Sequence, residues 1–263
     1  MNFTDIRIEQ DGKIGIILLN RPEQHNSLRG ETMAQLCQAI DLLEADAGVG
    51  AILLAAEGRH FCAGAEFAYL ETLKTTSAID VRDRIYAHFQ GAARRLFRSA
   101  KPTVAAVGGA AITVGCELAL ACDFRIGTEK SLFQESWIKL GLLPPLGGMF
   151  LLPRIVGLTR ANEMILRGRA VRGEEALRIG LVSELVAPEA LRARGVELAA
   201  ELAELPPRAY ALAKEGLQRG MESSIDREWA AGVLAQAMLI GTEDFREGLD
   251  AVTQKRAPRF TGR

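Results

Sequence analysis

The sequence lacks any apolar run of the length that crosses a bilayer, which takes about 18 residues or more. Its amino-terminal stretch also lacks the charged-then-apolar build of a signal peptide. Neither sign of charge is in excess, since 32 basic and 33 acidic residues leave a formal net charge of −1. A basic surface for nucleic acid or for an anionic membrane is therefore not expected. We predict a cytoplasmic protein that binds neither nucleic acid nor membrane.

Histidine and aromatic residues are scarce, with 3 histidines and 6% aromatic content. His25, His60 and His88 stand in separate segments without the spacing of metal ligands, which argues against a zinc site or a Ser-His-Asp triad. The four cysteines stand in apolar segments without zinc-finger spacing, at Cys37, Cys62, Cys116 and Cys122. We expect them to be small, reduced core residues, and we expect no metal site.

Apolar residues, in contrast, make up 48% of the 263 residues, which is enough for one sizeable core. Short, largely β-branched runs predict buried strands at residues 14–19, 51–55, 103–107 and 123–126. Amphipathic stretches predict helices at residues 30–47, 79–98 and 114–121. Because strands alternate with helices, we expect an α/β fold with parallel pairing and both sheet faces covered.

From about residue 188 onward the pattern is wholly helical. Four stretches carry apolar stripes, at residues 191–205, 207–219, 225–240 and 244–255. We therefore predict a core at residues 1–187 and a helical carboxy-terminal element at residues 188–263. Such helices could cap the core or contact another subunit, and the sequence leaves both arrangements open.

Two loops rich in small residues follow predicted strands, at residues 58–67 and 108–117. In the first, the small residues at 63–65 let a ligand approach the backbone N–H groups closely. The second runs into a helix start, where unpaired N–H groups and the helix dipole favour negative charge. Taken alone, the first loop is more commonly explained by a tight strand-to-helix connection, and the second loop is also explained by close packing of a helix on the sheet. Neither contains a phosphate-binding glycine motif. Together they can supply the two N–H donors that a thioester oxyanion requires, each worth about 3–4 kcal/mol.

Glu117 stands in the first turn of the helix that follows the second loop. Its neighbours Val114, Leu118 and Ala121 make this stretch too apolar for an ordinary solvated charge. Partial burial would raise the pKa of this carboxyl toward values useful for acid/base chemistry. A surface glutamate that complements the helix dipole is the plainer alternative.

The motifs occur in an order that resembles the enoyl-CoA hydratase/isomerase (crotonase) family over essentially the whole chain. The amino-terminal signature is Leu19-Asn20-Arg21-Pro22 with Asn26-Ser27-Leu28, and the first loop reads Phe61-Cys62-Ala63-Gly64-Ala65-Glu66. The central signature comprises residues 101–109 and 115–123, followed by similar segments at residues 140–144, 147–148, 180–182 and 245–248. Each motif is weak alone, but the ordered set is specific.

The resemblance implies a spiral of ββα units with a helical carboxy-terminal trimerisation element, assembled as a homotrimer or homohexamer. It implies an acyl-CoA thioester as substrate and no separate cofactor, because coenzyme A belongs to the substrate. Ala65 and Val114 would supply the oxyanion N–H groups, and Glu117 is the first of two glutamates that hydratases use. The substrate-binding positions implied by the resemblance, together with the surrounding apolar residues, are Gln24, His25, Ala63, Gly64, Glu66, Phe67, Ala68, Trp137 and Leu143.

The sequence departs from the family pattern at the second catalytic glutamate, whose position is occupied by Trp137. Tryptophan offers one N–H donor and cannot exchange protons at physiological pH. Glu135 is close in sequence, but two residues along a helix turn a side chain by about 200°, so it could substitute only if the backbone there is not helical. Glu66 or Tyr86, from other segments, is a further alternative.

Two smaller departures concern the shape of the site. Pro145 occupies the position where some family hydrolases and a dehalogenase place an aspartate, which argues against those reactions. Val114 occupies a position where glycine is usual, so the N–H is retained while the side chain narrows the pocket.

Three functions agree with these features. The leading hypothesis is an enoyl-CoA hydratase-type lyase in which Glu117 is the principal acid or base. Isomerisation, or another reaction of the family on a bulky or cyclic acyl group, is the second, with Trp137 as a flat wall of the pocket or as a core residue. The third is an acyl-CoA-binding protein without turnover, against which the retained Glu117 argues.

Overall fold

The computed structural model describes residues 3–263, except the side chain of Tyr86. Its main sheet has six strands in the order β1-β2-β3-β4-β6-β9. They comprise β1 (Ile6–Asp11), β2 (Ile14–Leu19), β3 (Ala51–Ala56), β4 (Thr103–Val107), β6 (Phe124–Gly127) and β9 (Glu184–Leu185). All pairs are parallel except β1 with β2, which form a hairpin. The predicted parallel core is confirmed, whereas β1 was not predicted.

Helices cover both faces of the main sheet, as its unbroken apolar strands require. One face contacts α1 (Gly30–Ala45), α4 (Gln90–Arg98) and α5 (Val114–Ala121), and the other contacts α9 (Leu191–Ala203). Successive strand residues point to opposite faces. Ile17 of β2 therefore lies in the core with α1, while Leu18 lies in the core with α9.

A second, smaller sheet lies beside the amino-terminal end of α5. It has the order β5-β7-β8 and contains β5 (Ala110–Ile112), β7 (Leu132–Gln134) and β8 (Ala170–Arg172). The short helices around it are 3-10 helix η3 (Trp137–Leu140), α6 (Gly148–Val156), α7 (Leu158–Ile165) and α8 (Gly173–Arg178). From the sequence, only the second loop of this region was singled out, by its small residues. The strands of the small sheet were not predicted, because they are too short to show a periodic pattern of apolar residues.

The helix predicted at residues 79–98 is interrupted. It comprises α3 (Ala78–Arg84), a π-helical segment η2 (Ile85–Phe89) and α4. Before it, α2 (Phe67–Leu73) continues from the first loop, and η1 (Pro22–Gln24) forms the turn after β2. A π segment inside a helix is frequent at functional sites, and this one borders the cavity described below.

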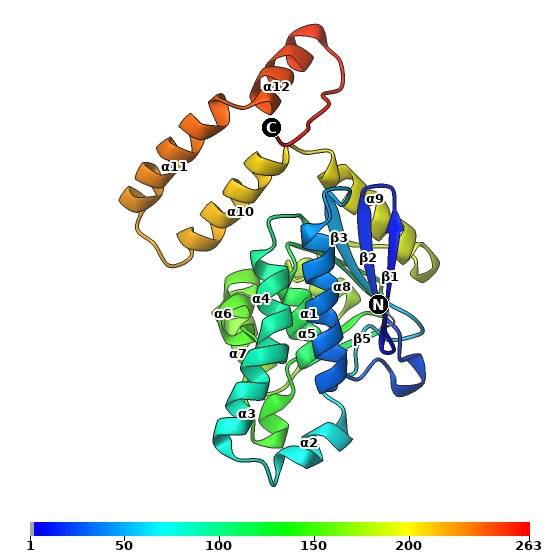
Figure 1. Ribbon diagram of the computed structural model, residues 1–263. Coiled ribbons are helices and arrows are strands. Elements are labelled where there is room, and N and C mark those ends of the chain that lie inside the picture. Colours follow the sequence, from blue (N-terminus) through cyan, green and yellow to red (C-terminus); the bar gives the residue numbers. More distant parts are fainter. Residues whose placement is uncertain (1–2) are drawn as a thin grey trace.

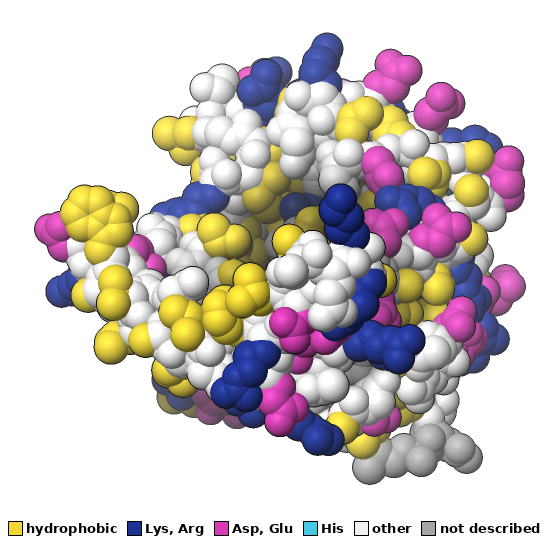
Figure 2. Space-filling view, turned by 90° about the horizontal axis from the view of Figure 1, so that it is seen from above, with side chains coloured by type: hydrophobic (Ala, Val, Ile, Leu, Met, Phe, Trp, Pro, Cys, Tyr) yellow, Lys and Arg dark blue, Asp and Glu magenta, His cyan; other side chains and the backbone are white. Residues whose placement is uncertain are grey.

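The carboxy-terminal helices α10 (Pro207–Gly220), α11 (Ile225–Ile240) and α12 (Glu243–Gln254) project from the body as an arm (Figure 1). Hydrophobic side chains gather on the arm (Figure 2). Trp229, Val233 and Met238 of α11 are exposed there. Before the arm, η4 (Pro188–Ala190) leads into α9, which packs on the main sheet. The boundary at residue 188 remains a prediction.

An ion pair that involves a buried lysine helps to anchor the arm to the body. The Nζ of Lys214 in α10 lies 2.8 Å from Oδ2 of Asp123 and is almost fully buried. The hydroxyl of Tyr210 donates to the same carboxylate oxygen at 3.1 Å. Within residues 3–263, no helix is long and apolar enough to cross a membrane. All four cysteines are buried and unpaired, as predicted.

Candidate active site

The two predicted oxyanion loops lie side by side. The N–H of Cys62 donates to the carbonyl of Ala110, and the N–H of Ile112 donates to the carbonyl of Cys62. The first loop thereby extends the edge of the small sheet at β5. This pairing brings Ala65 and Val114, which are 49 positions apart in sequence, to one site.

Ala65 and Val114 both present backbone N–H groups that have no hydrogen-bond partner among the described residues. The residues on either side of Ala65 both form backbone hydrogen bonds with Leu28. The carbonyl of Leu28 accepts from the N–H of Glu66, and the N–H of Leu28 donates to the carbonyl of Gly64. A residue in such a parallel bridge turns its own N–H away from the partner strand. Val114 is the first residue of α5, where an N–H has no partner within the helix.

Backbone strain supports this arrangement at two positions. Thr113 has φ 49° and ψ −113°, a conformation that is unfavourable for a β-branched residue. Gly64 has φ +102°, and a Cβ atom there would lie 2.4 Å from Oγ1 of Thr113. The close contact between the loops therefore requires glycine at position 64.

Both N–H donors belong to residues that line one cavity of about 530 Å³. Its walls are almost wholly apolar, from α2, α3, η2 and the segment after β7. The lining residues used below are Ala65, Leu70, Phe89, Val114, Trp137 and Leu143. Such a cavity suits a hydrophobic group attached to a carbonyl that the two N–H groups bind.

Glu117 is fully buried on α5, one turn after Val114, and it is not among the residues that line the cavity. Its Oε1 accepts from the N–H groups of Leu146 and Gly148 at 2.7 and 2.9 Å, and its Oε2 accepts from Nε1 of Trp137 at 3.2 Å. Burial raises the pKa of Glu117 to about 7, against the opposing effect of these three donors. The carboxyl can therefore gain or lose a proton near neutral pH.

Trp137 connects the cavity to Glu117, since it lines the cavity and its indole N–H donates to the carboxylate. It also belongs to the main apolar core. The two interpretations of this residue, pocket wall and core residue, therefore both apply.

The remaining predicted substrate-binding residues lie outside the cavity lining. Ala63 donates its N–H to the carbonyl of His25, so the loop around Gln24 lies against the first loop. Glu66 forms an ion pair with Arg21 at 2.8 Å. Phe67 is 75% exposed. The residues that do not line the cavity are Gln24, His25, Ala63, Gly64, Glu66, Phe67 and Ala68.

Several features of the site were not predicted. The cavity walls formed by Val81, Ile85 and Phe89 come from a helix whose apolar pattern gives no sign of a pocket. Glu135 was expected to approach the site only if the backbone near it is not helical, and this condition is met. The backbone between β7 and η3 is not helical, and the buried Glu135 carboxyl interacts electrostatically with Glu117.

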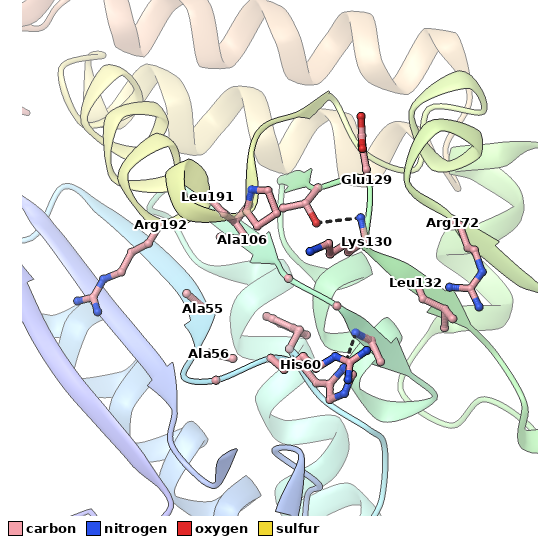
Figure 3. A pocket seen from close by; sticks show the side chains of 18 residues that line it. Ala55, Ala56, His60, Ala106, Glu129, Lys130, Leu132, Arg172, Leu191 and Arg192 are labelled. Atoms are coloured by element: carbon pink, nitrogen blue, oxygen red, sulfur yellow. Dashed lines mark hydrogen bonds between the residues drawn. The ribbon is translucent and has the colours of Figure 1, made fainter. Parts of the chain in front are cut away.

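A larger cavity of about 900 Å³ lies at the carboxyl ends of β3, β4 and β6 (Figure 3). Its lining includes four basic residues, Arg59, Lys130, Arg172 and Arg192. Arg192 forms an ion pair with Glu9, and its side chain points away from Lys130. This cavity contains neither oxyanion N–H and suits an anionic group rather than an acyl chain. No cluster of three or more potential metal ligands occurs within residues 3–263.

Comparison with known proteins gives the family. The model for "Enoyl-CoA hydratase/isomerase" matches residues 9–263. The chain belongs to the enoyl-CoA hydratase/isomerase family. It is 36% identical to a "Probable enoyl-CoA hydratase" of Rhizobium meliloti, over 100% of both chains. It is 32% identical to a "Crotonyl-CoA hydratase" of Syntrophomonas wolfei, over 99% of both.

Solved structures of this family share the fold. The crystal structure of a putative enoyl-CoA hydratase from Streptomyces coelicolor A3(2) superposes with a TM-score of 0.94 at 31% identity, covering 100% of this chain and 96% of that one. The predicted crotonase-type α/β fold is thus confirmed, and the protein is an enzyme of the enoyl-CoA hydratase/isomerase family.

Proposed function

We propose that the protein is an enoyl-CoA hydratase-type lyase that binds the thioester carbonyl between the N–H groups of Ala65 and Val114. The observation that carries the proposal is that both N–H groups lack a partner and belong to residues of one apolar cavity. Fixed donors of this kind stabilise the negative charge that develops on the carbonyl oxygen when the enolate forms.

In the proposed reaction, Glu117 accepts a proton from water as the hydroxyl adds to the β-carbon, and the enolate then takes a proton at the α-carbon. Because Trp137 cannot supply that proton, Glu117 returns it, either directly or through a second water that gives one proton to the α-carbon and takes one from Glu117. The pKa of Glu117, near 7 as a result of burial, suits a group that both accepts and donates. The carboxylate must become accessible to the reacting water when the thioester binds, since it is fully buried here.

The acyl group that fits best is larger than crotonyl. A cavity of about 530 Å³ with apolar walls lies within the range of pockets that hold drug-sized ligands. The indole of Trp137 offers a flat face to a cyclic or aromatic acyl group. The coenzyme A part of the substrate would then follow the loops around Gln24 and residues 65–68, with no separate cofactor.

Isomerisation of an enoyl-CoA double bond is the second candidate. One carboxyl that shuttles a proton between two carbons suffices for it, and Glu117 is a buried carboxyl that accepts three hydrogen bonds, one of them from the cavity residue Trp137.

The test is turnover of crotonyl-CoA and a panel of larger and cyclic enoyl-CoAs by the wild type and Glu117→Gln. We expect hydration by the wild type, greatest with a bulky acyl group, and a loss of at least about 100-fold in Glu117→Gln. Movement of the double bond without water addition would favour isomerisation. Tight thioester binding without any reaction would refute both and leave binding alone.

We further propose that the arm of α10–α12 mediates self-association into a trimer or hexamer. Its apolar side chains are largely exposed in the single chain; examples are Trp229 at 65% and Val233 at 70%. An exposed apolar patch of this kind is typical of a protein–protein interface. Light scattering should give a trimer or hexamer mass for the wild type and a smaller species for Val233→Asp; a monomeric wild type would contradict the proposal.

A further inference from the structure

Glu135 is a second carboxyl buried next to Glu117. Glu135 is fully buried, and neither of its side-chain oxygens has a hydrogen-bond partner among the described residues. The thiol of Cys116 is its polar neighbour and partly opposes the rise in the pKa of Glu135, but among the described residues no group reaches either oxygen in hydrogen-bond geometry. An ionised carboxylate in such surroundings is very unfavourable, whereas a neutral carboxylic acid is far less so.

The local backbone explains why this carboxyl faces α5. The N–H of Thr113 donates to the carbonyl of Gln134, which ties the end of β7 to the start of α5. Helix η3 begins only at Trp137, so residues 135 and 137 do not follow helical geometry relative to each other. Both side chains can therefore approach Glu117.

We propose that Glu117 and Glu135 form a carboxyl pair that shares one proton, with the charge on Glu117 and the proton on Glu135. Glu135 is then a positioning residue: it touches no substrate and sets the charge of the pair. This inference rests on the proposed function only for its effect on turnover.

The distribution of donors decides which carboxyl carries the charge. Glu117 accepts three hydrogen bonds, from two backbone N–H groups and the Trp137 indole, whereas Glu135 accepts none. Burial raises the pKa of Glu135 well above its ordinary value, and the nearby charge of Glu117 raises it further. Two such carboxyls titrate as one unit in two steps.

The other titratable groups around the pair do not neutralise it. Burial raises the pKa of the Cys116 thiol well above its usual range, so this thiol remains protonated. The positive charge of Arg125 lowers the pKa of the Cys116 thiol. The guanidinium of Arg125, however, donates its hydrogen bonds to the carbonyls of Leu181, Ala119 and Cys122. The pair thus holds at most one negative charge near neutral pH.

The expected consequence for catalysis is a pH window with two limits. Below the first ionisation Glu117 is protonated and cannot act as a base. Above the second ionisation Glu135 is charged, and a second buried negative charge opposes formation of the anionic enolate. The singly ionised pair is therefore the active form.

The direct test is infrared difference spectroscopy of the carboxyl carbonyl band during a pH titration. The wild type should show the band of a neutral carboxylic acid that persists above pH 8, and Glu135→Gln should lack it. In Glu117→Gln the band should disappear at lower pH than in the wild type, because Glu135 has lost its charged neighbour. Glu189→Gln, an exposed carboxyl, is the matched control and should leave the band unchanged.

Activity provides the second readout. In the profile of kcat/KM against pH, Glu135→Gln should keep the acid limb and lose the alkaline limb by at least about tenfold at the highest pH. Absence of the band in the wild type, or an unchanged band in Glu135→Gln, would overturn the inference even if the enzyme hydrates enoyl-CoA. A wild type that shows the band but turns over no thioester would refute the proposed function alone. The wild-type titration also remains decisive if Glu135→Gln does not fold.

Discussion

Trp137→Phe removes one of the three donors to Glu117 while keeping an aromatic wall in the cavity. The lost bond, from Nε1 to Oε2, is long at 3.2 Å, so we assign it the low end of the range for bonds to charged groups, about 1.5 kcal/mol. That free energy corresponds to about one pKa unit. Because the donor stabilises the ionised form, its loss raises the pKa of Glu117, from about 7 to about 8.

The assay is kcat/KM for enoyl-CoA hydration as a function of pH, which reports ionisations of the free enzyme. The acid limb should move by about one unit to higher pH in Trp137→Phe. Leu143→Ala is the matched control, since Leu143 lines the same cavity and is not one of the three residues that donate hydrogen bonds to Glu117. It should change the rate but leave the midpoint of the acid limb in place. An acid limb that stays in place or moves to lower pH in Trp137→Phe would refute the hydrogen bond as a determinant of that pKa.

Three further predictions concern stability and reactivity. Gly64→Ala should reduce the free energy of unfolding by more than about 3 kcal/mol and abolish turnover. The control Gly12→Ala, at a residue with positive φ but open space around it, should reduce the free energy of unfolding by about 1 kcal/mol in urea denaturation. Equal losses in the two variants would contradict the contact between the loops. Lys214→Met should cost about 3 kcal/mol because the largely buried Asp123 carboxylate loses its cation. Lys13→Met, from an exposed pair, should cost less than about 1 kcal/mol in the same assay. The four buried cysteines should react with a thiol reagent only after denaturation; rapid labelling of the native protein would show that one is accessible.

The buried strands and the main helices could be predicted because their apolar runs are long and bounded by clear turn residues. Helix α5, predicted at residues 114–121, begins and ends at Val114 and Ala121. Strand β1 could not be predicted in this way, since only Ile6 is buried and charged residues interrupt the apolar run. The three-residue strands of the small sheet form through pairing with distant segments, which leaves no local period.

The chemistry of the site was only partly accessible from sequence. The small residues of the two loops indicated the N–H donors, because close approach to a backbone requires residues such as Gly64. The carboxyl pair was missed because its geometry depends on where η3 begins, at Trp137 rather than before Glu135. A shift of two residues in a helix start reverses the direction of a side chain, and sequence does not fix helix starts to that accuracy.

The central claim is that the Val114 N–H stabilises the enolate, and the most direct measurement compares enoyl-CoA turnover by Val114→Pro and Val114→Ala. Proline at the first helical position removes the N–H where no helical bond is lost, whereas alanine keeps it. The account predicts that kcat falls by about 100- to 1,000-fold in Val114→Pro and changes by less than about tenfold in Val114→Ala, with both proteins folded. Equal kcat values for the two variants would contradict the claim.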